Sequence, residues 1–275
     1  MVRRFTLPAI ISMSLMMTGG SAFAVEIIAH RGASFDAPEN TLSAVRTAWE
    51  QGADAVEIDI WITKDNYIVA HHDETTKKTA GKDVPVAHQS LAELQALDFG
   101  RWKDPRFAGE RIATLREILA TVPEGKRLFI EIKAGQEIIP TLKDVLSASD
   151  IKPEQTALIG FSLETLQAVK ESLPDRKVFW IAGLKQNQRT KEWTPPVSNL
   201  VRRATEAGMD GLDVESVPAI DAAYVQTVKD AGLEFYVWTV NDAAEAARLV
   251  EAGVDGITTD RPGWLCERLN RRVEE

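Results

Sequence analysis

The amino-acid sequence predicts a (β/α)8 barrel with a small insertion after the second strand. The first observation is internal repetition, because several segments read as a helix that ends near a glycine and leads into a strand. The second is the alternation of eight short apolar segments with amphipathic helical ones. Alternation alone would also fit a doubly wound sheet, but eight strand–helix units in 275 residues favour the barrel.

The repeated junctions share a glycine followed two residues later by an acidic residue. These pairs are Gly52 and Asp54, Gly208 and Asp210, Gly232 and Glu234, and Gly253 and Asp255. The last three glycines are 24 and 21 residues apart, which suits one helix, one strand and two short loops. Glycine suits the position after a helix because it readily adopts the left-handed conformation there.

Taken in order, the apolar segments predict the eight barrel strands. We expect them at 26–29, 55–60, 128–132, 156–159, 177–181, 211–214, 234–238 and 255–258. An extension of the second strand is expected at 67–70, and clear helices at about 41–51, 163–172 and 242–251.

Two segments interrupt this regularity. Residues 74 to about 113 are too many for a loop between a strand and a helix, and they contain a helical piece at 90–97. We interpret this segment as an insertion. Residues 183–198, rich in Lys, Gln and Asn, are expected to form a surface loop, which could lie over the mouth of the barrel.

The N-terminus has the pattern of a secretory signal peptide. Arg3 and Arg4 precede an apolar run at 7–17, and Ala22-Phe23-Ala24 forms a cleavage site. We therefore expect residues 1–24 to be removed, the barrel to comprise 25–275, and the protein to be exported to the periplasm or secreted. No other stretch is apolar enough to cross a bilayer, so no stable membrane anchor is expected after cleavage.

The charge of the chain excludes some classes of partner. The net charge is −9 and would be −11 without Arg3 and Arg4, so nucleic acid and anionic membranes are poor partners. An anionic substrate would need a local cationic site. The single cysteine, Cys266, excludes an intrachain disulfide and is expected to pack in the last helix. The sequence does not indicate an oligomeric state.

Alternate carboxylates mark the ends of two predicted strands. Glu57 and Asp59 lie two residues apart, so their side chains share one strand face, and Glu131 precedes Lys133 in the same way. Two acids on a buried face are costly unless a cation lies between them. Oxygen ligands without a nearby thiolate favour Ca²⁺ or Mg²⁺ over Zn²⁺. A structural ion-pair network remains the alternative.

Two histidines and two cations accompany the carboxylates. His30 and Arg31 end the first predicted strand, and His72 follows the extension of the second. Active sites of such barrels lie at the C-terminal ends of the strands. Imidazoles could act as general acid and base, while Arg31 and Lys133 suit a phosphate group. This combination favours phosphodiester hydrolysis. It suits less well the alternative that Lys133 forms a Schiff base.

Other polar residues have plainer interpretations. His71 and His88 are expected on the surface. Asp213 and Glu215 share a strand face at the mouth and could contact substrate or its neighbours, and Trp238 could simply fill the top of the barrel.

The chain contains seven short motifs that include these residues and extend from the first predicted strand to the last. They are His30-Arg31-Gly32-Ala33, Pro38-Glu39-Asn40-Thr41, Glu57-Ile58-Asp59, His72-Asp73, Glu131-Ile132-Lys133, Trp238-Thr239-Val240-Asn241 and Thr259-Asp260-Arg261-Pro262. In residues and in order they resemble the glycerophosphodiester phosphodiesterases. One departure is the run from Lys77 to Gly81, where the family usually has an arginine.

The resemblance implies a barrel enzyme that cleaves a small-molecule glycerophosphodiester to sn-glycerol 3-phosphate and an alcohol. It also implies one divalent cation, Mg²⁺ or Ca²⁺. The implied roles are metal binding for Glu57, Asp59 and Glu131, acid/base catalysis for His30 and His72, phosphate binding for Arg31 and Lys133, bracing of the site for Glu39, and contact with glycerol for Trp238.

Two other functions remain open at this point. The first is a lysophospholipase D-like activity on single-chain phospholipids, which would need an apolar channel. Its candidates are Phe99, Trp102, Phe107 and Trp193. The second is a non-catalytic barrel that binds phosphoesters, although binding alone does not need the histidine pair.

Overall fold

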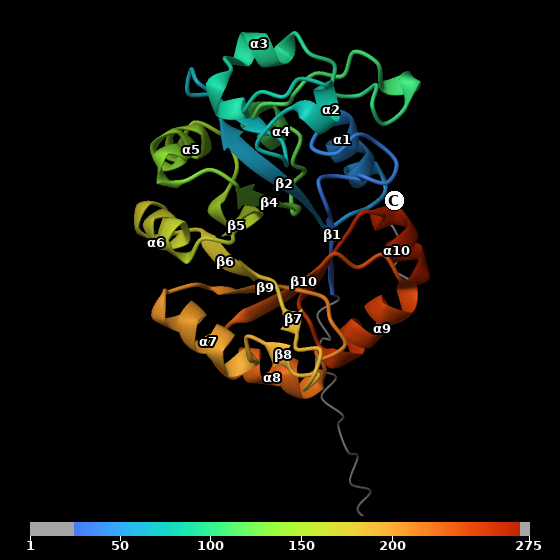
Figure 1. Cartoon of the computed structure of the whole chain (residues 1–275), viewed down its shortest axis with the longest axis vertical. Coiled ribbons are helices and arrows are strands. Elements are labelled where there is room, and N and C mark those ends of the chain that lie inside the picture. Colours follow the sequence, from blue (N-terminus) through green and yellow to red (C-terminus); the bar gives the residue numbers. More distant parts are fainter. Residues whose placement is uncertain (1–24, 270–275) are drawn as a thin grey trace, which may run out of the picture.

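The computed structural model describes residues 25–269, and the predicted signal segment lies outside this range. Eight parallel strands close into a barrel, because β1 pairs with both β2 and β11 (Figure 1). In order around the barrel the strands are β1 (Glu26–Ala29), β2 (Ala55–Ile62), β4 (Arg127–Ile132), β5 (Thr156–Gly160), β6 (Lys177–Ala182), β9 (Gly211–Glu215), β10 (Glu234–Trp238) and β11 (Gly256–Thr259). The predicted barrel is confirmed, and each strand lies within two residues of its predicted bounds.

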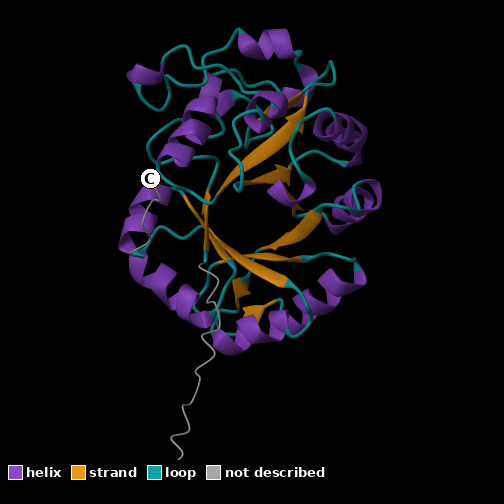
Figure 2. Ribbon diagram, turned by 180° about the vertical axis from the view of Figure 1, so that it is seen from behind, coloured by secondary structure: helices purple, strands orange, loops and turns teal. Residues whose placement is uncertain are grey.

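Helices surround the strands on the outside (Figure 2). They are α1 (Leu42–Glu50), α4 (Leu115–Leu119), α5 (Ile139–Ser147), α6 (Leu163–Ser172), α7 (Val197–Glu206), α8 (Ala222–Lys229), α9 (Ala243–Ala252) and α10 (Pro262–Arg268). Cys266 is buried in α10, as predicted. Among residues 25–269, no helix is both long and apolar enough to span a membrane.

The strand period of two determines what fills the barrel. Inward-facing apolar side chains, among them Phe129, Phe179 and Tyr236, form one buried cluster. The rings of Phe179 and Tyr236 stack with centroids 4.9 Å apart. Two residues further along β4 and β10, the same inner face carries Glu131 and Trp238. The aromatic cluster therefore lies below the polar side chains at the C-terminal end of the barrel.

The segment between β3 (Ile68–Ala70) and α4 forms a separate layer at one side of the barrel, coloured teal and green at the top of Figure 1. Strand β3 pairs antiparallel with β2, and the layer contains α2 (Lys77–Ala80) and α3 (Leu91–Gln95). It has its own apolar cluster, which consists of Val69, Val86, Leu94, Phe99 and Ile112. The segment is thus tied to the second strand, and its residues Lys78, Trp102 and Lys103 line a cavity together with residues that follow β1.

Two expectations need correction. Residues 183–198 are not only a loop, because they contain a short antiparallel hairpin of β7 (Lys185–Gln186) and β8 (Trp193–Thr194). His71 is not on the surface but 3% exposed. Its ring nitrogens form hydrogen bonds with the Asp73 carbonyl and the Thr79 hydroxyl at 2.7 and 2.8 Å, because the insertion folds over it. His88 is exposed, as predicted.

Candidate active site

The strand ends bring the predicted polar residues to one small cavity, called here the deep cavity. Its polar side consists of His30, Arg31, Glu57, His72, Glu131 and Lys133. Its other side consists of Ile159, Phe161, Ile181, Asp213, Trp238 and Thr258. Residues as far apart in the sequence as His30 and Thr258 therefore meet at the C-terminal end of the barrel, as the fold predicts.

Three carboxylates form the centre of this site. Glu57, Asp59 and Glu131 each place one oxygen within 4.8 Å of the others. Glu57 and Asp59 are 4% and 1% exposed, and the side chain of Glu131 is 12% exposed. Burial and the charges of Asp59 and Glu131 raise the pKa of Glu57 well above its usual range. Burial and the charge of Asp59 likewise raise the pKa of Glu131 to about 7.

Two cations partly balance the carboxylates. Lys133 Nζ lies 2.8 Å from Glu131 Oε1 and 3.4 Å from Asp59 Oδ1, and Arg31 Nε lies 3.3 Å from Asp59 Oδ2. Burial opposes ionisation of Asp59, but Arg31 and Lys133 outweigh it and lower the pKa of this carboxyl. Among the described residues the site thus holds three acids against two cations, and neither cation forms an ion pair with Glu57.

The three carboxylates fit a divalent metal ion. Glu57 Oε1 is buried and has no hydrogen-bond partner among the described residues, so it is available as a ligand atom. An all-oxygen set suits a hard cation better than Zn²⁺. The group can therefore bind a metal ion, and Glu57, Asp59 and Glu131 are the residues that would hold it.

The backbone conformation of the loop after β1 determines the position of Arg31. Arg31 has φ 55° and Gly32 φ 78°, and a Cβ on Gly32 would lie 2.5 Å from the Ala44 carbonyl carbon. Only glycine fits there, because the loop passes against the start of α1. In this turn the Arg31 amide donates to Glu57 Oε2 at 2.8 Å.

Asn40, in the same loop, fixes the position of Asp59, another of the three candidate metal ligands. Its side-chain Nδ2 donates to Asp59 Oδ2 at 2.8 Å, and its Oδ1 accepts from the Asp59 amide at 3.0 Å. The loop after β1 therefore fixes both Glu57 and Asp59 on the end of β2.

Each candidate catalytic histidine contacts a carboxylate through Nδ1. His30 Nδ1 lies 2.6 Å from Asp260 Oδ1, and Asn241 Nδ2 donates to Asp260 Oδ2 at 2.6 Å. Burial opposes ionisation of Asp260, but the contacts with His30, Asn241 and Ser34 outweigh it, and the pKa of this carboxyl falls to about 2. An ionised Asp260 accepts a hydrogen bond from Nδ1 and so leaves His30 Nε2 for the cavity.

His72 has a similar arrangement. Its Nδ1 lies 2.7 Å from Asp73 Oδ1, and its side chain is 31% exposed. Partial burial lowers the pKa of His72, so the neutral imidazole is favoured near pH 7. The two histidines thus approach one cavity from β1 and from the segment after β3, each oriented by a carboxylate.

Glu39 lies beside Arg31, and Trp238 lies in the wall of the deep cavity. Glu39 accepts from Arg31 Nη1 at 3.2 Å and from Lys78 Nζ at 3.0 Å, so it braces Arg31 rather than joining the three carboxylates. Trp238 lines the deep cavity, and its Nε1 donates to the Asp213 carbonyl at 3.2 Å. Lys78 occupies the run in which the sequence departs from the family pattern.

Known proteins are similar to this chain in sequence and in fold. Residues 30–264 match the model of the glycerophosphoryl diester phosphodiesterase family. The chain belongs to this family. The family and the class of enzyme predicted from the motifs are therefore confirmed.

Individual relatives agree with this assignment. A glycerophosphodiester phosphodiesterase of Caldanaerobacter subterraneus is 33% identical over 89% of this chain and 98% of its own length. The solved structure of an Oleispira antarctica phosphodiesterase, in complex with the product sn-glycerol 3-phosphate, has a TM-score of 0.78 and 26% identity, and the match covers 89% of this chain and 96% of that one. A glycerophosphodiester phosphodiesterase of Agrobacterium tumefaciens has a TM-score of 0.74 at 25% identity, with 89% and 100% of the two chains covered.

Sequence reasoning did not assign several residues that shape the site. Asp260 and Asn40 lie within quoted motifs, but their contacts with His30 and Asp59 depend on the folded chain. Asp213, which the sequence indicated only as a possible contact of the substrate or its neighbours, is 4% exposed, and its Oδ1 has no partner in the described part of the chain. Burial, together with the charge of Glu131, raises the pKa of Asp213 to about 8.

Phe161 is a further residue of the cavity wall that the sequence did not indicate. A single aromatic residue after a strand is common, so it carries no signal of its own. Its ring meets that of Trp238 edge to face, with centroids 6.0 Å apart, and this contact depends on the closed barrel.

A divalent cation should stabilise the folded protein through the three carboxylates. After chelation, Mg²⁺ or Ca²⁺ at about 100 times its Kd should add about 2.7 kcal/mol to the free energy of unfolding, which thermal melting would detect. Glu57→Gln should melt no lower than the wild type without metal, because it removes a buried like charge. Its metal-induced shift should be much smaller.

The exposed Glu124→Gln is the matched control and should keep the full shift. Equal shifts for Glu57→Gln and the wild type, or no shift in the wild type, would show that the carboxylates do not bind the ion.

Proposed function

We propose that the protein hydrolyses glycerophosphodiesters to sn-glycerol 3-phosphate and an alcohol, with His30 and His72 as the acid/base pair. One observation carries this proposal. Two histidines, each oriented by a carboxylate, face the same cavity as two cations and two of the three clustered acids. Membership of the family supports the reaction class.

The residues that line the deep cavity have different proposed roles, according to the chemistry of their side chains. Arg31 and Lys133 are cations on the cavity wall and would hold the phosphate oxygens. One imidazole would remove a proton from the attacking water, or from a glycerol hydroxyl whose cyclic phosphodiester is then opened by water, and the other would donate a proton to the oxygen of the leaving alcohol. Trp238 and Phe161 would pack against the carbon atoms of the glycerol half and exclude water from that side.

We propose one divalent cation, Mg²⁺ or Ca²⁺, as the cofactor held by Glu57, Asp59 and Glu131. When bound, it would supply positive charge close to the phosphate and so favour the negative charge that develops during displacement. The unpartnered oxygen of Glu57 and the excess of acids over cations, both among the described residues, support this part of the proposal.

The alternatives receive less support from the structure. Among the four aromatic residues considered for a lipid channel, Phe99 is 3% exposed in the core of the insertion, and Trp193 packs against the barrel core. Trp102 lines a cavity at the mouth, but that cavity is also lined by charged side chains. A non-catalytic barrel would not need two histidines with their orienting carboxylates. A small glycerophosphodiester remains the favoured substrate.

We also propose that the protein is exported. Arg3 and Arg4, the apolar run that follows them and the Ala22-Phe23-Ala24 site support this location. Expression of the full chain should yield a mature protein that begins at Val25, and N-terminal sequencing would identify it. A secreted or periplasmic product that still begins at Met1 would reject the cleavage site.

The reaction can be tested directly on glycerophosphocholine. Purified protein should release sn-glycerol 3-phosphate, lose this activity after chelation, and regain it when Mg²⁺ or Ca²⁺ is returned. Product would be measured by an enzyme-coupled assay. No release from several headgroups with any metal would reject the proposed function. Choline release from lysophosphatidylcholine alone would favour the lipid-directed alternative.

His72→Ala should lower kcat by roughly 10²–10⁴-fold, which is the usual contribution of acid/base catalysis. The variant should still fold, because His72 is partly exposed and its removal leaves no buried charge. His88→Ala makes the same change at an exposed histidine in the insertion and should retain wild-type kcat. Near-normal turnover of His72→Ala would show that this imidazole has no catalytic role.

Asp260→Asn should lower kcat by roughly 10–100-fold with little change in melting temperature, because it removes the carboxylate that orients His30. The matched control is Asp83→Asn, since Asp83 is an exposed partner of Lys77 in the insertion. Steady-state kinetics would separate the two variants. Unchanged kcat in Asp260→Asn would show that His30 does not depend on this contact.

A further inference from the structure

A second and wider cavity opens beside the deep cavity and is called here the outer cavity. It has a volume of about 350 Å³, against about 80 Å³ for the deep cavity. Both cavities include His30 and Arg31 in their walls. A phosphate held by Arg31 would therefore lie at their junction, with one ester arm in each cavity.

The two groups esterified to the phosphate of a glycerophosphodiester, glycerol and a second alcohol, differ in the size of the binding site that they need. Glycerol is small and common to all these substrates, and it suits the narrow deep cavity with Trp238 in its wall. The alcohol varies in size and needs more room. We propose that the outer cavity binds this alcohol and selects polyol headgroups over quaternary ammonium headgroups. This inference rests on the proposed function and adds the class of alcohol to it.

Lys103 supplies an uncompensated cation in this cavity. Its Nζ donates to the Ser34 carbonyl at 2.7 Å, and no carboxylate lies within 4.0 Å of it in the part of the chain that the structure describes. An ammonium group has three donors, so two remain for a ligand. Lys103 can therefore donate to hydroxyl groups of an alcohol and would repel a trimethylammonium group.

Trp102 does not offer a free site for a cation. Lys78 Nζ already lies 5.4 Å from the centroid of its ring, and the indole Nε1 donates to the Phe99 carbonyl at 2.8 Å. A quaternary ammonium group approaching this ring would meet the charge of Lys78. The uncharged carbon atoms of a polyol can pack against the exposed part of the same ring without that repulsion.

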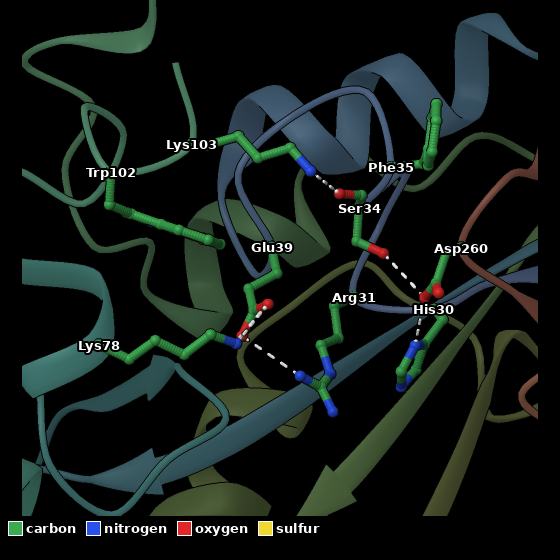
Figure 3. A pocket seen from close by; sticks show the side chains of 9 residues that line it. All are labelled: His30, Arg31, Ser34, Phe35, Glu39, Lys78, Trp102, Lys103 and Asp260. Atoms are coloured by element: carbon green, nitrogen blue, oxygen red, sulfur yellow. Dashed lines mark hydrogen bonds and ion pairs between the residues drawn. The ribbon is translucent and has the colours of Figure 1, made fainter. Parts of the chain in front are cut away.

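Hydrogen-bond acceptors complete the wall. Glu39 accepts three hydrogen bonds from Arg31 and Lys78, whereas a carboxylate can accept about four. Figure 3 shows Lys78 and Trp102 on one side of the cavity, and Phe35, Asp260 and His30 on the other. A wall that combines donors, acceptors and aromatic rings suits hydroxyl groups, which both donate and accept.

The test compares kcat/KM for glycerophosphoinositol and glycerophosphocholine. The wild type should prefer the inositol substrate by about ten-fold or more, since a hydrogen bond to a charged group contributes about 1.5–3 kcal/mol. Lys103→Met should remove most of this preference, and Lys103→Arg should retain it. The exposed Lys77→Met, in the same insertion, should leave it unchanged.

A product-inhibition assay separates recognition from structural damage. Free inositol should inhibit the wild type more strongly than Lys103→Met, whereas inhibition by sn-glycerol 3-phosphate should be equal in both. If Lys103→Met does not fold, Trp102→Leu provides the second variant and should also reduce the preference for inositol.

The outcomes distinguish this inference from the proposed function. Failure of the wild type to cleave either substrate would reject the proposed function itself. Cleavage of both at similar efficiency, or a preference for choline, would overturn the polyol site while leaving the reaction intact. Equal losses on both substrates in Lys103→Met would assign Lys103 a structural role and also overturn the inference.

Discussion

Three carboxylates share the interior of the barrel within 4.8 Å of one another, and the cost of burying this charge constrains the rest of the site. Arg31 and Lys133 contact Asp59, and Lys133 also contacts Glu131, but Glu57 keeps an oxygen without a partner among the described residues. A protein that only needed stability would gain from replacing such a group with apolar residues. The arrangement is better explained by a ligand that brings positive charge.

The barrel makes this arrangement possible by separating its interior into levels. Phe129, Phe179 and Tyr236 fill the lower level, and polar residues two positions further along the strands form the upper one. Water is excluded from below by the aromatic packing, so the upper level is open only at the mouth. Electrostatic interactions are stronger in such a partly closed site than in water.

The loops then divide the mouth into two unequal cavities. The turn at Arg31 and Gly32 places the guanidinium between them, while the insertion supplies Lys78, Trp102 and Lys103 to the outer one. In the proposed binding mode, separate elements would recognise the glycerol half of the substrate and its variable alcohol. If the proposed function holds, a changed insertion would alter the preferred alcohol without disturbing Arg31 and Lys133, the groups proposed to bind the phosphate.

The sequence by itself determined the barrel, its strands and the main polar residues, whereas the tertiary structure decided their contacts, burial and charge. Strand alternation places Glu57 and Asp59 on one face whatever the tertiary structure, and the order of motifs identifies the family. The contact of His30 with Asp260 joins the first strand to the last and exists only because the barrel closes. His71 precedes His72 directly, yet the insertion buries His71 and leaves its neighbour at the cavity. Exposure and ion pairing depend on what the folded chain places nearby, and the strand and helix periods that are visible in a sequence carry no information about that.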